Sequence, residues 1–270
     1  MLAPVSEFDR AAAVHRQDPG RYRASADPEW GGFGRPQGGY VAAQLLDAMI
    51  QEVGDADRSP RTATVHMLRG PQFGSYDIEV ALERTGRTMS NLTARLTQDG
   101  KLIAVALGLF GHDRPGPRFD ERPMPQVDPP SPQRRTNMEL PGFTAPFADR
   151  IVAEHRLGPR PFASPEGPMR LAGWLGFADA RPVDGPGLFV LCDALLMPLW
   201  VRLDRPVPTA TIDYTLHFRA PLPRADPSEM VLAEMSTGLL RDGYFDWDGT
   251  VWGQDGTLLC TMRQGLTIVA

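Results

Sequence analysis

Two polar side chains stand inside otherwise apolar segments of the sequence. Asp193 is the only charged residue in GLFVLCDALLMPLW (187–200), and Gln264 lies in GQDGTLLCTMRQGLTIV (253–269). Because an unpartnered buried carboxylate is costly, Asp193 is expected either to act as a general base that takes a proton from water or to cap a short helix that Pro198 ends. The Gln264 carboxamide is expected either to orient a ligand or to face water at a strand end.

The segment that carries Gln264 has an earlier copy in the chain. Its QDG turn recurs 156 residues before (254 − 98), in TQDGKLIAVALGLFG (97–111). That copy has Leu107 and Gly108 where the later one has Arg263 and Gln264. Arg263 is expected on the opposite face of its strand, in solvent. The carboxamide is therefore specific to the second copy, which predicts an asymmetric pair with one working site.

The repeat also predicts the elements that position these residues. HMLRGP (66–71) resembles HFRAP (217–221), and an apolar helical segment precedes each of them. In the first of these segments, GGYVAAQLLDAMIQEV (38–53), the spacing of the apolar residues indicates one buried helical stripe: Val41, Leu45, Leu46, Met49 and Val53. Each half is expected to have a lead-in strand, a helix and about four strands joined by Asp-Gly hairpins. We therefore predict an α+β fold, with each helix packed on an antiparallel sheet.

A proline-rich segment, RPGPRFDERPMPQVDPPSPQRR (114–135), separates the two copies. Proline at this density excludes a helix or a central strand and favours a semi-rigid surface connector. The predicted organisation is a first half over residues 1–113, a connector over 114–160 and a second half over 161–270.

Composition excludes several classes of protein. The net charge is −5 and the pI about 5.6, which argues against nucleic-acid binding. The sequence contains no apolar run long enough for a membrane span and no evident secretion signal. Cys192 and Cys260 form no disulfide framework, so a reducing, cytoplasmic location is expected. The five histidines lack metal-ligand spacing, and neither a metal nor another cofactor is expected.

Several stretches, taken in order, resemble the acyl-CoA thioesterase II family, a double-hotdog group, and its thioesterase-like relatives. These stretches are QGGYVAAQLLDAM, HMLRGP, ERTGRTMSNLTARLTQDGKLIA, the CD of LCDALLMP, TATIDYTLHFRAP and QDGTLLCTMRQG. The resemblance implies two tandem hotdog repeats, each with a long helix wrapped by a curved antiparallel sheet. It also implies hydrolysis of acyl-CoA, or a related acyl thioester, to a free acid and coenzyme A.

In that family an Asp, a Thr or Ser, and a Gln of the second half carry the reaction. By resemblance these roles fall on Asp193, Thr211 and Gln264, although Thr209 competes with Thr211 for the hydroxyl. The resemblance implies that the three hold one water for attack on the thioester, and the absence of a G-x-S-x-G or H-E-x-x-H motif agrees with this.

The developing negative charge on the carbonyl oxygen also requires hydrogen-bond donors. Gly38, Gly39 and Tyr40 open the first predicted helix, and backbone N–H groups at a helix start suit such an oxygen. The first half would then supply the oxyanion hole and the second half the water. Arg35, Pro36 and Gln37 separate an earlier Phe33-Gly34 from these glycines, whereas well-known family members run the glycines together.

Two other functions stay open at this point. One is hydration or dehydration of an enoyl thioester, which would need a paired Asp and His or His and Glu. The other is a non-catalytic acyl-thioester binder. The expected partners are an acyl-CoA substrate and a second copy of the chain in a homo-oligomer, with no nucleic acid and no membrane.

Overall fold

The computed structural model describes residues 5–134, 136, 145–194 and 197–269. Its helices are α1 (Glu7–Ala11), α2 (Gly38–Val53) and α3 (Gly185–Cys192), with 3-10 turns η1 (Pro28–Trp30), η2 (Pro146–Arg150) and η3 (Pro198–Arg202). The strands before the connector are β1 (His15–Asp18), β2 (Arg21–Ala26), β3 (Gly31–Gly32), β4 (Arg35–Pro36), β5 (Ser59–Met67), β6 (Gly74–Thr85), β7 (Met89–Gln98) and β8 (Lys101–Gly111). The later strands are β9 (Ile151–Leu157), β10 (Arg170–Phe177), β11 (Thr209–Phe218), β12 (Val231–Ser236), β13 (Leu240–Arg241), β14 (Tyr244–Trp252) and β15 (Leu258–Ile268).

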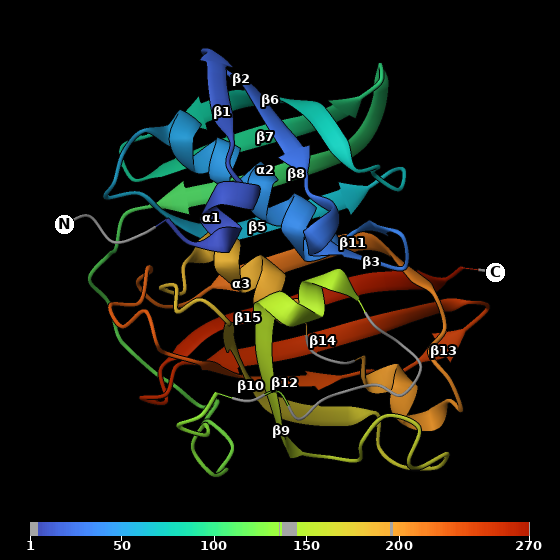
Figure 1. The fold of residues 1–270 in the computed structure, drawn as a ribbon. Helices are drawn as coiled ribbons and strands as arrows, with labels where there is room; N and C mark the ends of the chain where they lie inside the picture. The colour runs from blue at the N-terminus through green and yellow to red at the C-terminus, as the bar shows by residue number, and fades with distance from the viewer. Residues whose placement is uncertain (1–4, 135, 137–144, 195–196, 270) are drawn as a thin grey trace.

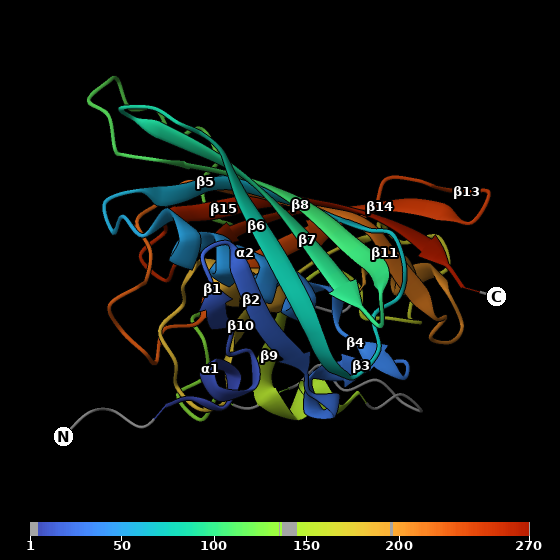
Figure 2. The same cartoon turned by 90° about the horizontal axis from the view of Figure 1, so that it is seen from above.

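One antiparallel sheet runs through the whole molecule. Its strands follow the order β1-β2-β6-β7-β8-β5-β11-β15-β14-β12-β10-β9, with β13 paired to β14. The order is nearly symmetrical about the β5–β11 seam, since β8 and β15 come next on the two sides and β7 and β14 follow them. The helices lie on one side of this curved sheet (Figures 1 and 2).

Helix α2 confirms the predicted apolar stripe. Val41, Leu45, Leu46 and Met49 are at most 1% exposed, and Val53 packs partly buried at the edge of the core. The helix stops at Gly54, whose φ of 60° is a left-handed conformation that glycine adopts without strain. Over the described residues, no helix is both long and apolar enough to cross a bilayer.

Helix α3 is shorter than the apolar sequence around it suggested. It has eight residues, against sixteen in α2, and ends at Cys192 rather than continuing to Pro198. Asp184 caps its start by accepting from the N–H of Gly187 at 2.7 Å. Its last turn tightens, because the Asp193 N–H bonds to the carbonyls of both Val190 and Leu191. This end leaves the Asp193 side chain free to turn toward α2.

Both predicted QDG hairpins are present, with different turns. Asp99 and Gly100 have φ of 50° and 73°, as a two-residue type I′ turn between β7 and β8 requires. The turn between β14 and β15 is longer. There the Gly253 N–H bonds to the Thr257 carbonyl at 2.9 Å, and Gly256 has a φ of 82°.

The seam between β5 and β11 joins the two predicted halves into one continuous sheet. At its centre the hydroxyl of Thr215 donates to that of Thr64 at 2.9 Å, and the two residues face each other in register. The repeat maps one of these threonines onto the other, since HMLRGP begins at His66 and HFRAP at His217. The halves therefore meet through equivalent strands.

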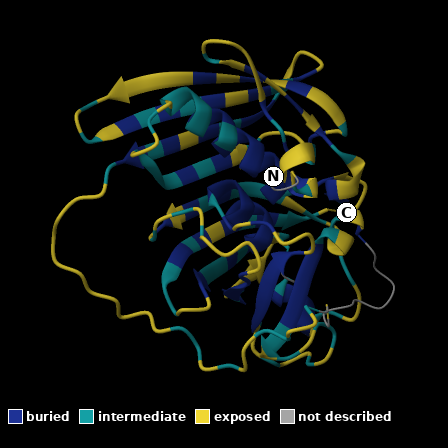
Figure 3. Ribbon diagram, turned by 60° about the vertical axis from the view of Figure 1, so that its left-hand side comes forward, coloured by how far each residue is buried: buried dark blue, intermediate teal, exposed yellow. Residues whose placement is uncertain are grey.

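The connector is largely exposed, as its prolines predict, and loops away from the sheet before returning to it (Figure 3). Two indole N–H groups fix its return, Trp252 to the Arg122 carbonyl at 3.0 Å and Trp174 to the Asp128 carbonyl at 2.8 Å. Residues 135 and 137–144 of the predicted connector lie outside the described residues. Strand β9, which falls inside the predicted connector of residues 114–160, pairs with β10 at the edge of the sheet.

A buried arginine ties the N-terminal segment to α3. Arg181 is 7% exposed and donates to Asp9 of α1 at 2.7 Å and to Asp184 at 2.6 Å. Its guanidinium lies 4.7 Å from the ring centre of Phe8 and 5.3 Å from that of Phe177. Because a planar guanidinium can pair with carboxylates and stack on rings at once, this one residue holds elements far apart in the sequence.

We predict that Arg181→Met lowers the free energy of unfolding by about 3 kcal/mol, since it leaves two carboxylates without their shared cation. The matched control is Arg23→Met, which removes an exposed pair with Asp77 and is expected to cost under about 1 kcal/mol. Denaturant unfolding measures both losses, and equal losses would contradict the assigned role of Arg181.

Candidate active site

The three residues expected to act together converge on one point. The carboxamide of Gln264 donates through Nε2 to Asp193 Oδ1 at 3.1 Å and to Thr211 Oγ1 at 2.7 Å. The second carboxylate oxygen, Asp193 Oδ2, accepts from the backbone N–H of Gly39 at 2.8 Å. The residues come from β15, β11 and the end of α3, and they meet the start of α2 from the first half.

Asp193 occupies the C-cap of α3, and Asp184 caps the start of that helix. Residues 195 and 196, in the short helix that Asp193 is alternatively expected to cap, lie outside the described residues. The Asp193 carboxylate instead faces the first turn of α2, where N–H groups lack partners within the helix and the helix dipole is positive. Its position therefore depends on the packing of the two helices against each other.

Thr211 reaches the site through a β-bulge. Regular alternation from Tyr214, Leu216 and Phe218, which face the core, would put Thr211 on the outer face. The pairing of β11 with β15 shifts between Thr211 and Asp213, so one extra residue turns Thr211 inward.

The bulge also separates the two candidate hydroxyls. Thr211 contacts Gln264, whereas the Thr209 hydroxyl lies 3.5 Å from the sulfur of Met197. Of the two threonines, Thr211 is therefore the one within hydrogen-bond distance of Gln264.

Gln264 is fully buried, and its neighbour Arg263 lies on the outer face, where it pairs with Asp246 at 2.5 Å. In the first half the equivalent position is Gly108, where an added Cβ would lie 2.6 Å from the sulfur of Met49 in α2. In the first copy, the side chain of Met49 from α2 thus fills the space that the Gln264 carboxamide occupies in the second copy.

The surroundings of Asp193 shift its acidity. Burial raises the pKa of this carboxyl to about 6, against the smaller lowering effects of the Gly39 N–H and the Gln264 amide. At neutral pH the group is therefore mostly ionised, yet it binds a proton far more readily than an ordinary aspartate. Both properties suit a general base.

A cavity of about 550 Å³ opens beside these groups. Asp193, Thr211 and Gly38 belong to its wall, while Gln264 lies behind them. The remaining wall is mainly apolar, with Met67, Phe147, Met197, Trp200, Trp247 and Leu266 among its residues. A carboxylate and a hydroxyl at the wall of an apolar cavity are typical of a small-molecule site.

The predicted donors at the start of α2 differ in their positions. Gly38 lines the cavity, and a Cβ there would lie 2.8 Å from Thr211 Oγ1. The Gly39 N–H is already bonded to Asp193. The Tyr40 side chain is fully buried, and its hydroxyl bonds to the carbonyls of Ala11 and Ser25, away from the site.

The cavity wall also contains Arg35, Gln37 and Arg69, to which the sequence analysis gave no role. Gln37 directly precedes the predicted glycines, and that adjacency was the only signal in the sequence for it. No group of three or more His, Cys, Asp or Glu residues that could hold a metal ion occurs among the described residues.

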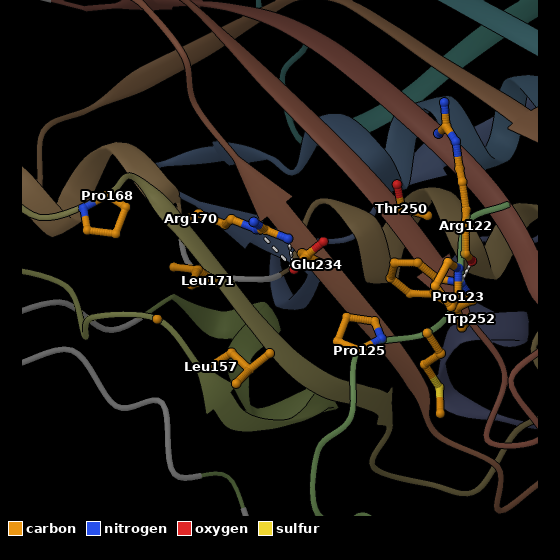
Figure 4. A pocket seen from close by; sticks show the side chains of 12 residues that line it. Arg122, Pro123, Pro125, Leu157, Pro168, Arg170, Leu171, Glu234, Thr250 and Trp252 are labelled. Atoms are coloured by element: carbon orange, nitrogen blue, oxygen red, sulfur yellow. Dashed lines mark hydrogen bonds and ion pairs between the residues drawn. The ribbon is translucent and has the colours of Figure 1, made fainter.

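A second cavity, of about 680 Å³, lies between the connector and the outer face of the second half. Figure 4 shows Arg170 turned toward Glu234 there, with Pro125 and Leu157 beside them. These two charges are paired at 2.7 Å. Asp193, Thr211 and Gln264 all lie elsewhere, so the second cavity is not the site predicted from the sequence.

Two family models match most of the chain. A family model for the acyl-CoA thioesterase C-terminal domain matches residues 120–268, and one for the N-terminal domain matches residues 26–111. The sequence matches none of the curated proteins compared with it.

Several solved structures resemble the chain over nearly its full length. A hot dog fold protein of unknown function from Alicyclobacillus acidocaldarius is 27% identical, with a TM-score of 0.86 and 99% of each chain covered. A candidate thioesterase II from Thermobifida fusca is 22% identical, with a TM-score of 0.83 and 100% of each chain covered. The tesB protein of Mycobacterium avium subsp. paratuberculosis is 19% identical, with a TM-score of 0.79 and 99% and 100% of the two chains covered.

We predict that Gly39→Ala lowers the free energy of unfolding by about 2–3 kcal/mol through overpacking, because the new Cβ would overlap the Phe189 carbonyl and lie 2.8 Å from Asp193 Cβ. The control is Gly238→Ala, where no atom lies within 4 Å of the added carbon. Denaturant unfolding of the two variants measures the difference, and a Gly39 variant as stable as the control would contradict the close helix contact.

Proposed function

Because the chain belongs to the acyl-CoA thioesterase family, and is accordingly a thioester hydrolase with a hotdog fold, we propose that Asp193, Thr211 and Gln264 hold the water that attacks its substrate. The observation that carries this proposal is the Gln264 amide, which bonds the carboxylate and the hydroxyl together at the wall of the cavity. The proposed substrate is a fatty acyl-CoA or a related acyl thioester.

Each residue has a separate proposed task. Thioesters are activated, because sulfur donates its lone pairs poorly into the carbonyl, so a held water can attack without a covalent intermediate. Asp193 takes the proton of that water. Thr211 Oγ1 already accepts from Gln264, so its own proton is directed elsewhere, toward the water oxygen. Gln264 is a positioning residue, since its amide orients the other two groups from behind the wall.

The start of α2 is the proposed site for the thioester carbonyl oxygen. The Gly39 N–H stabilises Asp193 instead of the substrate, so the Gly38 N–H and the helix dipole remain from the predicted set. Tyr40 would contribute only through its backbone. The first half would then bind the carbonyl oxygen at the start of α2, and the second half would hold the attacking water.

A tandem arrangement of two hotdog repeats is the proposed fold in detail, with residues 1–113 and 161–270 as the two units. The nearly symmetrical strand order and the Thr64–Thr215 contact at the seam support it. The eight-residue α3 departs from the pattern of one long helix in each repeat.

We propose a cytoplasmic location and a homo-oligomeric assembly for this chain. Cys192 and Cys260 are free, with sulfurs 4.0 Å apart, which supports a reducing, cytoplasmic location. The match to acyl-CoA thioesterase domains supports a role in fatty acid metabolism. The sheet ends in β1 and β9, and their outer edges support association with a second copy of the chain.

We predict that Asp193→Asn lowers kcat/KM about 100- to 10,000-fold, the usual contribution of a general base. Thiol release from acyl-CoAs ranging from acetyl to palmitoyl measures this loss. Asp246→Asn is the control, because that carboxylate pairs with Arg263 on the outer face, and its activity is expected to equal that of the wild type.

Three outcomes would contradict the proposal. Equal rates for wild type and Asp193→Asn would remove Asp193 from the mechanism. Loss of the enoyl-thioester absorbance of crotonyl-CoA without release of thiol would indicate a hydratase, although the described residues of the cavity wall include no histidine. Tight binding of every acyl-CoA without turnover would indicate a binding protein.

The rate is also predicted to depend on pH through Asp193. Only the ionised carboxylate accepts a proton, so kcat/KM should rise about tenfold per pH unit below the pKa of about 6 and level off above it. The effect of pH on the free energy of unfolding has the opposite sign. Folding raises the pKa of Asp193 from about 3.9, so the folded state binds this proton more tightly than the unfolded state. The contribution of Asp193 to the free energy of unfolding is therefore complete below about pH 3.9 and is lost as pH rises through about 6. A pH–rate profile that is flat between pH 5 and 7 would contradict this assignment.

A further inference from the structure

Gln37 lies directly before α2, in the wall of the same cavity as Asp193 and Thr211. Its backbone is fixed on both sides, because its N–H donates to the Trp30 carbonyl at 3.0 Å and its carbonyl accepts from Val41 at 3.2 Å. The residue is only 7% exposed. A carboxamide is thus held at the start of the helix where the substrate carbonyl is proposed to bind.

The polar atoms of this side chain are poorly satisfied within the protein. Oε1 is buried and has no hydrogen-bond partner among the described residues. Nε2 lies 3.5 Å from the Val190 carbonyl, at the outer limit of a hydrogen bond. That carbonyl already accepts from the Asp193 N–H at 3.2 Å. Although it occupies the N-cap position, the side chain makes no capping bond.

Such a residue weakens the fold unless a ligand uses it. A buried amide without good partners costs stability, and most buried polar side chains in folded proteins are bonded. A methionine of similar length would fill the same space without this cost. Because Gln37 Nε2 is held only by a bond of 3.5 Å and the residue lies beside Gly38 in the cavity wall, its donor is available to an acceptor that enters the cavity.

Of the donors predicted for the proposed reaction, only the Gly38 N–H remains at this place. The carbonyl oxygen gains charge as water attacks, and donors aimed at it are the largest source of rate in acyl transfer. The Gly39 N–H is committed to Asp193, and the Tyr40 hydroxyl is directed to backbone carbonyls. Gln37 Nε2 lies on the same helix start and has only a weak bond to give up.

We propose that Gln37 is a catalytic residue whose Nε2–H donates to the carbonyl oxygen of the bound acyl thioester, an inference that rests on the proposed function. Water oxygen forms a bond to the carbonyl carbon as Asp193 takes its proton, and the π electron pair moves onto the oxygen held by Gln37. When the carbonyl re-forms, the carbon–sulfur bond breaks and the departing thiolate recovers the proton from Asp193.

The first experiment compares Gln37→Met with Gln44→Met in the full chain. Gln44 is also buried on α2, but both ends of its amide are bonded, to Ser25 and to Tyr76. For Gln37→Met we expect kcat for octanoyl-CoA to fall about 100- to 1,000-fold, with KM nearly unchanged and the melting temperature equal or higher. For Gln44→Met we expect a lower melting temperature and a kcat close to that of the wild type.

The second measurement is the infrared carbonyl stretch of octanoyl-CoA bound to Asp193→Asn, which slows turnover. A donor on the carbonyl oxygen lowers this frequency, so adding Gln37→Met should shift the band to higher frequency, while adding Gln44→Met should not.

The outcomes separate the two proposals. If the wild type releases no thiol from any acyl-CoA, the proposed function and the role of Gln37 both fail. If the wild type is active and Gln37→Met retains its kcat, or if the carbonyl band does not move, only the role of Gln37 fails. If Gln37→Met lowers the melting temperature as Gln44→Met does but keeps its kcat, the role of Gln37 is structural and not catalytic.

Discussion

The hydrogen bond from the Gly39 N–H to the Asp193 carboxylate is the interaction on which the rest of the site depends. It joins the start of α2 to the end of α3, and therefore the first half of the chain to the second. A carboxylate in this enclosed position needs donors to stay ionised. The helix start supplies one of them, but only because a glycine lets the Phe189 carbonyl come so close.

The second requirement is an asymmetry between two similar halves. Gln264 and Gly108 occupy equivalent positions on equivalent strands, yet one orients polar groups and the other accommodates Met49. The longer α2 uses its side chains to fill the core, whereas the shorter α3 stops where Asp193 can turn outward from the helix. Helix α2 thus mainly packs the core, whereas the end of α3 positions Asp193.

Much of this arrangement could be predicted from the sequence, because it rests on local patterns. The apolar stripe of α2 is visible as the spacing of its residues, and the hairpins are visible as Asp-Gly pairs. Gln264 is visible as a difference between the two copies, because the earlier copy has Gly108 at that position. The inward direction of Thr211 could not be predicted, since alternation in β11 puts it on the outer face and only the bulge at Ile212 reverses it. The use of the Gly39 N–H by Asp193, and the exposure of Gln37 to the cavity, depend on how α2 and α3 pack, which no single segment encodes.

The β5–β11 seam has a consequence for how such a site can change over time. In an assembly of two identical chains, every substitution is introduced twice, so a glutamine gained at one position displaces the packing residue at its mirror position as well. In the proposed tandem arrangement the two positions are encoded separately within one gene product. Each position can then change independently of the other. The half without the polar residues can fill its space with larger side chains, and their packing can stabilise the half that carries the polar residues.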